Sequence, residues 1–228
     1  MVENPKTFSV AIDGPSGAGK STIAKLCAEE LGFLYVDTGA IYRTVGLAVR
    51  EAGISSKDAE GVAELLPRLQ ISMSHDQSGL QLMLLNGRDV TAEIRRPEIS
   101  IYASDVSAMP AVRAFLLDMQ RRLAAENSVI MDGRDIGTVV LPEADMKIFL
   151  TADAGERASR RYEELMLRGV QTTYEEVLKD IEYRDKNDSS RAAAPLKRAE
   201  DAILVDTTGN TLNQSFLHIC KLIKEKMT

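Results

Sequence analysis

The sequence is poor in cysteine and has no long apolar run, and each shortage excludes a class of protein. Its two cysteines, Cys27 and Cys220, are too few for a disulfide framework, and no CxxC pair or Cys/His cluster indicates a zinc site. No stretch approaches the ~18–20 uncharged apolar residues that a membrane-spanning helix needs. Residues 1–6 lack the basic and apolar regions of a secretory signal. We therefore expect a cytoplasmic protein without a membrane association.

An excess of positive charge is also missing. The net charge is −6 and the pI is about 5.1, which argues against broad, sequence-independent binding of DNA or RNA. A few clustered arginines can still form a local anion site in an acidic protein. The 228 residues, of which 44% are hydrophobic, suit one domain or one core that carries a sizeable insert.

Short apolar segments alternate with amphipathic ones along most of the chain. The buried strands that we predict lie at 7–12, 33–36, 129–131, 146–150 and 202–205. Helices are expected at about 23–31, 40–52, 154–168, 173–191 and 212–226. Strands that alternate with helices indicate a parallel sheet covered on both faces, so the predicted fold class is α/β.

Residues 69–91 interrupt this alternation. Residues 69–75 and 80–85 are typical of strands, and the residues between them are typical of a turn. Asn86-Gly87 is a tight-hairpin signal that leads into 88–91. The sequence therefore predicts a small antiparallel sheet set into the α/β chain.

Two prolines further along, Pro97 and Pro110, each suit the first turn of a helix. The second of these helices has apolar residues at core spacing, namely Val112, Phe115, Leu116, Met119 and Leu123.

The strongest motif is a glycine-rich loop between a predicted strand and a predicted helix. It reads Gly14-Pro15-Ser16-Gly17-Ala18-Gly19-Lys20-Ser21 and fits the pattern G-x4-G-K-[ST]. Its glycines let the backbone wrap round phosphate, while amide N–H groups and the helix N-terminus face the anion. Lys20 would bridge the β- and γ-phosphates, and the Ser21 hydroxyl would ligate Mg²⁺. We assign this loop, together with Thr22, to the binding of ATP.

Two classes of protein compete for this motif, a GTPase-like switch and a small-molecule kinase. A switch should carry an N-K-x-D guanine reader, which the sequence lacks. Asp206-Thr207-Thr208-Gly209 fits D-x-x-G, but it follows a late strand and we interpret it as a turn. A kinase needs a second phosphate site and a lid that excludes water, because ATP would otherwise be hydrolysed.

Two motifs that directly follow predicted strands supply candidates for the second site. The segment Asp37-Thr38-Gly39-Ala40-Ile41-Tyr42-Arg43 lies at the edge where α/β sheets bind ligands, and Arg43 would hold an acceptor phosphate. The alternative is an N-capped helix with a surface arginine. Gly133-Arg134-Asp135 follows residues 129–131 in the same way. Asp132 would lie beside the Mg²⁺ site without binding the ion directly.

The predicted helix at 154–168 carries Arg157, Arg160 and Arg161 at positions i, i+3 and i+4. These arginines share one helix face, as expected of a lid that clamps the phosphates during transfer. The alternative is a solvated face paired to Glu164 and its neighbours.

The next helix carries Arg184, Asp188 and Arg191 at positions i, i+4 and i+7. They also share a face and would read a phosphate and a sugar hydroxyl together. The alternative here is ordinary surface ion pairing.

With these motifs in place, the chain resembles the bacterial-type cytidylate kinases, P-loop nucleoside monophosphate kinases that act on CMP and dCMP. The resemblance runs nearly end to end. It rests on residues 12–21, 37–43 and 132–140, and on Arg184-Asp185 followed by Arg191 and Ala194-Pro195-Leu196. Many relatives have glycine where this chain has Ser21, and serine suits Mg²⁺ ligation at least as well.

The resemblance implies a P-loop NTPase fold with a five-stranded parallel sheet flanked by helices, a small antiparallel-sheet insert and a short helical lid. It also implies a division of the chain. The core would comprise 1–61, 109–152 and 170–228, the monophosphate-binding insert 62–108, and the lid 153–169. We expect a monomer that acts on small molecules, without nucleic acid or membrane partners.

The resemblance further implies a role for each site residue. Cytosine would face Ser104, Arg113 and Asp135, the sugar would face Arg184 and Asp188, and the acceptor phosphate would face Arg43, Arg134 and Arg191, with Thr38 and Tyr42 beside them. The catalytic residues would be Lys20, Arg134, Arg157 and Arg161. The implied reaction is in-line transfer of the γ-phosphoryl group of Mg·ATP to the 5′-phosphate of CMP or dCMP.

The assignment to cytosine makes chemical sense. An aspartate can accept a hydrogen bond from the N4 amino group, and an arginine can donate to N3 and O2. Uracil has a carbonyl at position 4, which would face the carboxylate, and such a mismatch can cost ~10⁴-fold in discrimination. The alternative that remains is a P-loop kinase for another small acceptor, such as UMP or a non-nucleotide metabolite.

Overall fold

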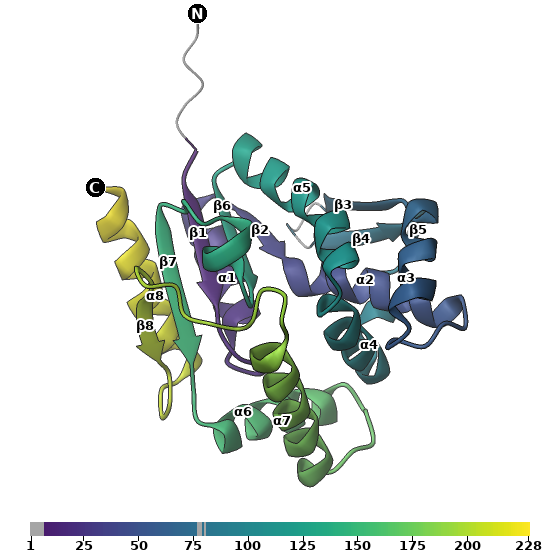
Figure 1. Ribbon diagram of the computed structural model, residues 1–228. Coiled ribbons are helices and arrows are strands. Elements are labelled where there is room, and N and C mark those ends of the chain that lie inside the picture. Colours follow the sequence, from purple (N-terminus) through teal and green to yellow (C-terminus); the bar gives the residue numbers. More distant parts are fainter. Residues whose placement is uncertain (1–6, 77–78, 80) are drawn as a thin grey trace, which may run out of the picture.

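A five-stranded parallel sheet lies at the centre of the protein. The computed structural model describes residues 7–76, 79 and 81–228. The strand order is β2 (Leu34–Asp37), β6 (Val129–Gly133), β1 (Ser9–Asp13), β7 (Met146–Thr151) and β8 (Ile203–Asp206) (Figure 1). The predicted strands of this sheet are confirmed, with small shifts at their ends. The predictions for residues 1–6, 77, 78 and 80 lie outside the described residues.

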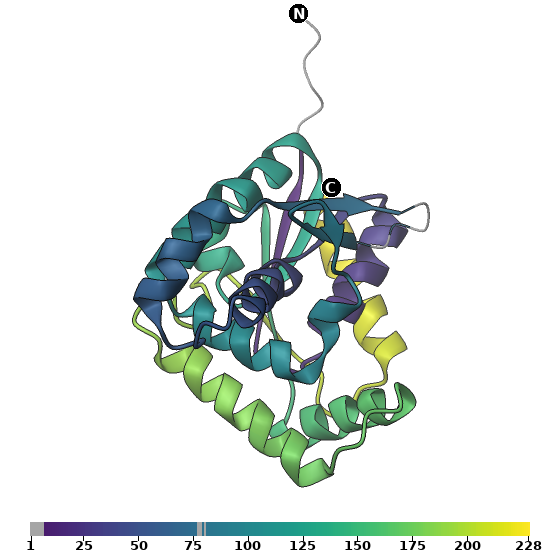
Figure 2. The same cartoon turned by 90° about the vertical axis from the view of Figure 1, so that its right-hand side faces the viewer.

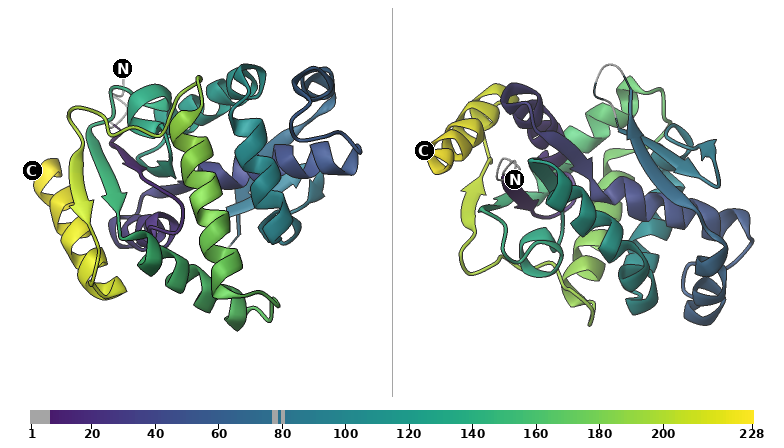
Figure 3. Two further views of the ribbon diagram at one scale, coloured as in Figure 1. Left: turned by 60° about the horizontal axis from the view of Figure 1, so that its bottom comes forward. Right: turned by 90° about the horizontal axis from the view of Figure 1, so that it is seen from above.

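Helices cover both faces of this sheet. On one face, α1 (Lys20–Leu31) and α8 (Leu212–Met227) pack against Val10 and Ile12 of β1. On the other face, Ala11 joins the cluster that contains α2 (Thr38–Glu51). Successive residues of β1 are thus buried on opposite sides, as expected for a parallel sheet with two covered faces. Figure 3 shows α8 running along β8, with α2 on the far side of the molecule.

The predicted antiparallel sheet is confirmed. It has the order β3 (Ile71–His75), β4 (Gln81–Leu85) and β5 (Arg88–Asp89). The turn from β4 to β5 has Asn86 at φ 51° and Gly87 at φ 80°. Positive φ at both positions is what a two-residue hairpin turn requires, and Asn-Gly adopts it readily.

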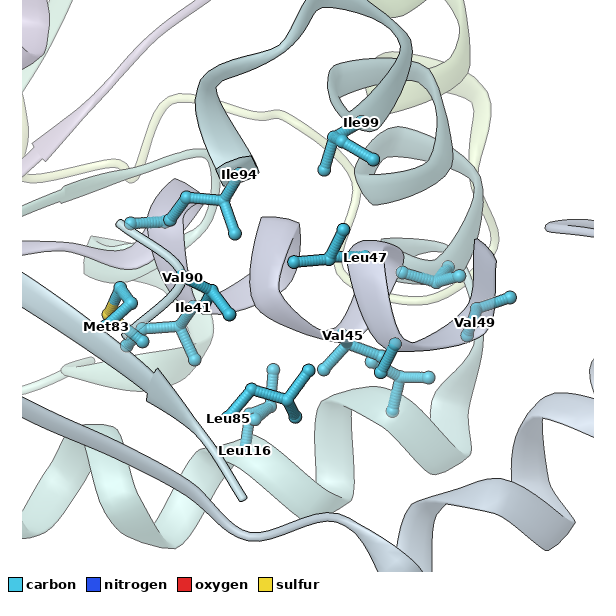
Figure 4. Packing of buried hydrophobic residues seen from close by; sticks show 14 of the residues in the cluster. Ile41, Val45, Leu47, Val49, Met83, Leu85, Val90, Ile94, Ile99 and Leu116 are labelled. Atoms are coloured by element: carbon cyan, nitrogen blue, oxygen red, sulfur yellow. The ribbon is translucent and has the colours of Figure 1, made fainter. Parts of the chain in front are cut away.

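The apolar face of this small sheet packs on α2. Met83 and Leu85 of β4 point toward Ile41 and Val45 of α2 in one large apolar cluster (Figure 4). Two segments around the sheet were not predicted, α3 (Ala59–Leu65) with the 3-10 turn η1 (Leu66–Arg68), and the 3-10 turn η2 (Glu93–Arg95).

The two predicted proline starts are confirmed, because α4 (Pro97–Ser107) and α5 (Pro110–Glu126) begin with them. The expected core residues of α5 need one correction. Val112 and Leu116 are buried, and Met119 and Leu123 pack against the same cluster, but Phe115 is 37% exposed. The four packed residues form a stripe at i, i+4, i+7 and i+11, and Phe115 lies at the flank of that stripe.

Helices α6 (Ala154–Leu167) and α7 (Tyr174–Ser190) form a pair with an apolar cluster of their own. That cluster contains Ala158 and Leu165 from α6 and Val177 and Ile181 from α7. Thr173 opens α7 with a capping box, which fixes where the helix begins. The pair lies at the end of the molecule away from the start of β1 (Figure 2). Among the described helices, none is both long and apolar enough to cross a membrane.

The correction on α5 predicts a contrast between two neighbouring residues. Leu116→Ala should lower the free energy of unfolding by about 2–5 kcal/mol, because Leu116 is almost fully buried and alanine would leave a cavity. Phe115→Ala should cost less than half as much, since its ring remains partly in solvent. Urea denaturation followed by circular dichroism measures both. Equal losses would mean that Phe115 belongs to the core after all.

Candidate active site

A cavity of about 560 Å³ opens at the carboxyl ends of β1, β2 and β6, and most of the predicted site residues line it. The predicted residues in its lining are Ser16, Gly17, Ala18, Gly19, Lys20, Ser21, Thr22, Thr38, Tyr42, Arg43, Ser104, Asp132, Arg134, Asp135, Arg161, Arg184, Asp188 and Arg191. Four predicted residues are not part of this lining, namely Gly14, Pro15, Arg113 and Arg157. Segments far apart in the sequence therefore meet in one place.

The glycine-rich loop forms one wall of this cavity. At Gly14, an added Cβ would lie 1.9 Å from the carbonyl oxygen of Leu150, so only glycine fits where β1 passes into the loop beside β7. The loop ends at Lys20, the first residue of α1. Among the described residues, no side chain caps this helix end, so its first N–H groups are available to an anion.

Lys20 is buried inside the loop, with only 5% of its surface exposed. Its Nζ donates to the carbonyl oxygen of Pro15 over 2.7 Å. Burial, helped by the positive charge of Arg134, lowers the pKa of Lys20 to about 7, although Asp132 and Asp13 oppose the shift. A cation in this setting is stabilised by any negative charge that enters the loop.

Ser21 and Asp132 meet beside the loop. The Ser21 hydroxyl donates to one carboxylate oxygen of Asp132 over 2.8 Å, and the Tyr35 hydroxyl donates to the other over 3.0 Å. Burial, helped by the nearby negative charge of Asp37, raises the pKa of Asp132 to about 6. A hydroxyl and a carboxylate at the phosphate-binding wall are the hard oxygen donors that Mg²⁺ prefers, so these residues fit that ion.

Asp37 organises the next part of the wall. It caps α2 by accepting from the Ala40 N–H over 2.8 Å, and it accepts from Arg43 over 2.7 Å. Burial would raise the pKa of Asp37, but Arg43 and then Arg95 hold it below its usual value. Helix α2 is therefore N-capped, as one interpretation of this segment expects. Arg43 also lines the cavity, as the interpretation as a phosphate site requires.

Asp135 and Asp188 join α5, α7 and the segment after β6 through ion pairs. Asp135 accepts from Arg113 and, over 3.2 Å, from Arg191. Asp188 accepts from the Nε of Arg134 over 2.7 Å. Burial raises the pKa of Asp135 even though Arg113 and Arg191 oppose it. An ionised Asp135 therefore depends on these arginines.

Around these pairs lie aromatic and amide groups. The guanidinium of Arg113 sits 5.6 Å from the ring centre of Tyr42. The Ser104 hydroxyl oxygen accepts from the Asn187 amide over 2.8 Å. Asn187 stands next to Asp188 on α7, so Ser104 of α4 is tied to the same helix.

Positive charge accumulates on the α7 side of the cavity. Burial lowers the pKa of Arg184 to about 10, and the positive charges of Arg134 and Arg161 contribute to the shift. A buried cation that lies beside further positive charges favours an anionic ligand.

The arginines of α6 were predicted to act from one face, but they leave the helix in three directions. Arg157 turns to the glycine-rich loop and donates to the Ser16 carbonyl oxygen over 2.7 Å. Arg160 donates to the Thr207 carbonyl oxygen over 2.9 Å, away from the cavity. Arg161 lines the cavity and pairs with Glu164 over 2.7 Å. The lid and the surface-pairing interpretations both find support in Arg161.

Several residues of the site were not predicted. Asp13 accepts from the N–H groups of Ile136 and Gly137, each over 2.8 Å, and so fixes the turn that follows Asp135. Gln81 of β4 accepts from the Asp37 N–H over 2.8 Å, which ties the small sheet to the cavity wall. Gln81 is a polar residue on the otherwise apolar face of β4, and this exception in the sequence pattern could have identified it as part of the site. Asp185 accepts from the Ser16 N–H over 3.0 Å. It belongs to the motif Arg184-Asp185, but no role was predicted for it.

Comparisons with known proteins point to one family. The family model of cytidylate kinase matches residues 10–225. A cytidylate kinase of Caldicellulosiruptor saccharolyticus is 49% identical over 217 residues, which cover 95% of this chain and 96% of that protein. One of Leuconostoc mesenteroides is 48% identical over 221 residues, with 97% and 98% covered.

A solved structure of an uncharacterised protein from Eubacterium ventriosum is similar in fold, with a TM-score of 0.53 at 13% identity over 96% of this chain and 99% of that one. The family model and the close relatives span nearly the whole length. The chain belongs to the cytidylate kinase family.

Proposed function

We propose that the protein phosphorylates CMP and dCMP to CDP and dCDP by in-line transfer of the γ-phosphoryl group of ATP to the acceptor 5′-phosphate. The observation that carries this proposal is the shared cavity. A phosphate loop forms one wall, and buried Arg–Asp pairs suited to a nucleoside monophosphate form the other. The names of the close relatives support the same reaction.

On the donor side, the loop from Gly14 to Thr22 would bind the phosphates of ATP through its backbone and through Lys20. Mg²⁺, when bound, neutralises charge on the β- and γ-phosphates. Ser21 would hold the ion directly, and Asp132 would orient Ser21 through the hydrogen bond between them. A negative charge at Lys20 would raise its pKa from about 7 and keep it protonated.

On the acceptor side, Asp135 would accept from cytosine N4, while Arg113 would donate to the ring acceptors and Ser104 would complete the edge. Arg184 and Asp188 would bind the sugar. Each guanidinium has five N–H donors, and a carboxylate partner occupies at most two of them. N–H donors would therefore remain for the 5′-phosphate while the guanidinium groups hold their carboxylates. The residues that would bind this phosphate are Arg43, Arg134 and Arg191, helped by Thr38 and Tyr42.

The acceptor phosphate is already ionised, so the transfer needs no strong general base. Catalysis would consist of positioning and of charge neutralisation by Lys20, Arg134 and Arg161. Arg157 would contribute through the loop, since it bonds to the Ser16 carbonyl oxygen. The insert 62–108 and the lid 153–169 would close on the core 1–61, 109–152 and 170–228. The enzyme would work as a cytoplasmic monomer.

The donor-site assignment predicts a loss of turnover without a loss of fold. Lys20→Met should lower kcat about 10²- to 10³-fold on CMP, because the uncharged side chain fills the same space but cannot stabilise the transferring phosphoryl group. A coupled ATP/ADP assay measures the rate, and far-UV circular dichroism checks the fold. Turnover close to that of the wild type would contradict the ATP-site assignment.

The lid assignment predicts different effects for two arginines of one helix. Arg161→Ala should lower kcat much more than it raises the KM for CMP, because the contact with the phosphoryl group would form on closure. Arg160→Ala is the matched control, since Arg160 bonds to Thr207 outside the cavity, and it should leave kcat within about two-fold. Unchanged kcat in Arg161→Ala would favour the surface-pairing interpretation.

The base-reading assignment predicts a change in acceptor choice. Asp135→Asn should lower kcat/KM for CMP about 10- to 150-fold, because a buried hydrogen bond to a charged group is worth about 1.5–3 kcal/mol. UMP should be affected much less. Asparagine is preferred to alanine because its amide keeps one oxygen acceptor for Arg113 or Arg191 and nearly the volume of the aspartate side chain.

Arg134→Ala is the control, since phosphate is common to all acceptors and this variant should slow CMP and UMP alike. Equal losses for the two substrates in Asp135→Asn would show that Asp135 does not read the base.

A further inference from the structure

Both backbone groups of Ser16 in the phosphate loop are bound by side chains from α6 and α7. The Ser16 N–H donates to one carboxylate oxygen of Asp185 over 3.0 Å, and the Ser16 carbonyl oxygen accepts from Arg157 over 2.7 Å. Arg157 also donates to the other Asp185 oxygen over 2.6 Å. The three groups thus form a closed ring of hydrogen bonds.

This ring is anchored, and its Ser16 and Arg157 members are shielded from water, while the Asp185 side chain keeps 23% of its surface exposed. The Nε of Arg157 donates to the Ala152 carbonyl oxygen over 3.0 Å, just beyond the end of β7. Ser16 is 3% exposed and Arg157 is 6% exposed. An ion pair in such surroundings is screened less than one on the surface, and loss of one partner leaves the other unpaired.

The neighbouring residue Gly17 shows that α6 and α7 press directly against the loop. A Cβ added to Gly17 would lie 3.1 Å from the Arg157 carbonyl oxygen and 3.3 Å from Cδ1 of Ile181. The path of the loop backbone therefore depends on where these two helices lie.

Helix α7 faces both halves of the cavity. Arg184 and Asp188, which flank Asp185 in the sequence, line the cavity on the acceptor side. Asp185 itself turns to the donor loop. One helix thus carries the acceptor-side contacts and the contact that holds the loop backbone.

We propose that Asp185 is a positioning residue of the donor site, which holds the phosphate loop in its binding shape through the Ser16 amide and through Arg157. This role rests on the proposed function, because it assumes that the loop binds ATP. Asp185 is not among the residues that line the cavity. Its effect should therefore fall on donor binding and not on acceptor binding.

Three variants test this role by calorimetric titration of a non-hydrolysable ATP analogue with Mg²⁺ and, separately, of CMP. Asp185→Ala should weaken binding of the analogue about 10- to 100-fold, the equivalent of one hydrogen bond to a charged group, and leave the Kd for CMP within about three-fold. Asp185→Asn keeps an oxygen acceptor for the Ser16 N–H but loses the charge opposite Arg157. It should give an intermediate loss.

Glu182→Ala, an exposed carboxylate on the same helix, is the matched control and should bind both ligands like the wild type. Circular dichroism checks each fold, and if Asp185→Ala fails to fold, the near-isosteric Asp185→Asn carries the comparison. Analogue binding within about two-fold of wild type in the folded Asp185 variants would overturn the proposal. So would equal weakening of the analogue and CMP, which would make Asp185 a general support of α7.

The titrations require no turnover, so they are independent of the reaction. Wild-type protein that binds the ATP analogue but does not phosphorylate CMP would overturn the proposed function, while the Asp185 comparison would still decide the role of that residue.

Discussion

The cavity is held in shape by the pairing of buried carboxylates with buried or partly buried arginines. A buried charge without a partner costs several kcal/mol, so each of these groups constrains the element that carries its partner. Asp37 holds Arg43 within α2, Asp135 holds Arg113 of α5 and Arg191 at the end of α7, and Asp188 of α7 holds Arg134 after β6. The strand ends, α5 and α7 are thereby fixed around one space. Apolar packing builds the sheet and its helices, but the ion pairs decide where the functional groups point.

The same pairs leave the site ready for an anionic ligand. An arginine bonded to a carboxylate keeps several donors. Burial, together with the positive charges of Arg134 and Arg161, lowers the pKa of Arg184, so a negative charge beside it is favoured. Lys20 at the opposite wall is likewise a buried cation, and burial lowers its pKa. Phosphate groups that enter from either side would therefore meet cations that are already desolvated and held in place, with little reorganisation left to do.

Local signals were sufficient for most of the fold. The strand–loop–helix segment at Gly14–Lys20, the proline starts of α4 and α5 and the Asn86-Gly87 turn all follow from the chemistry of a few adjacent residues. The position of Phe115 could not be predicted, because the flank of an apolar stripe is buried only if a neighbouring element reaches it. The hydrogen-bond partners of Arg157 could not be predicted from the sequence either. Three arginines at helical spacing share a face, but Ser16 lies 141 residues away, and only the tertiary structure brings its carbonyl oxygen to that helix.

The position of α7 between the two halves of the cavity has a thermodynamic consequence. The loop contact of Asp185 and the cavity contacts of Arg184 and Asp188 belong to one rigid helix. If an acceptor shifts the equilibrium position of α7, it changes the affinity of the loop for the donor by some factor. Reciprocity then requires the donor to change the affinity for the acceptor by the same factor. Binding in random order with mutual cooperativity, or mutual antagonism, would be built into the geometry of a single helix.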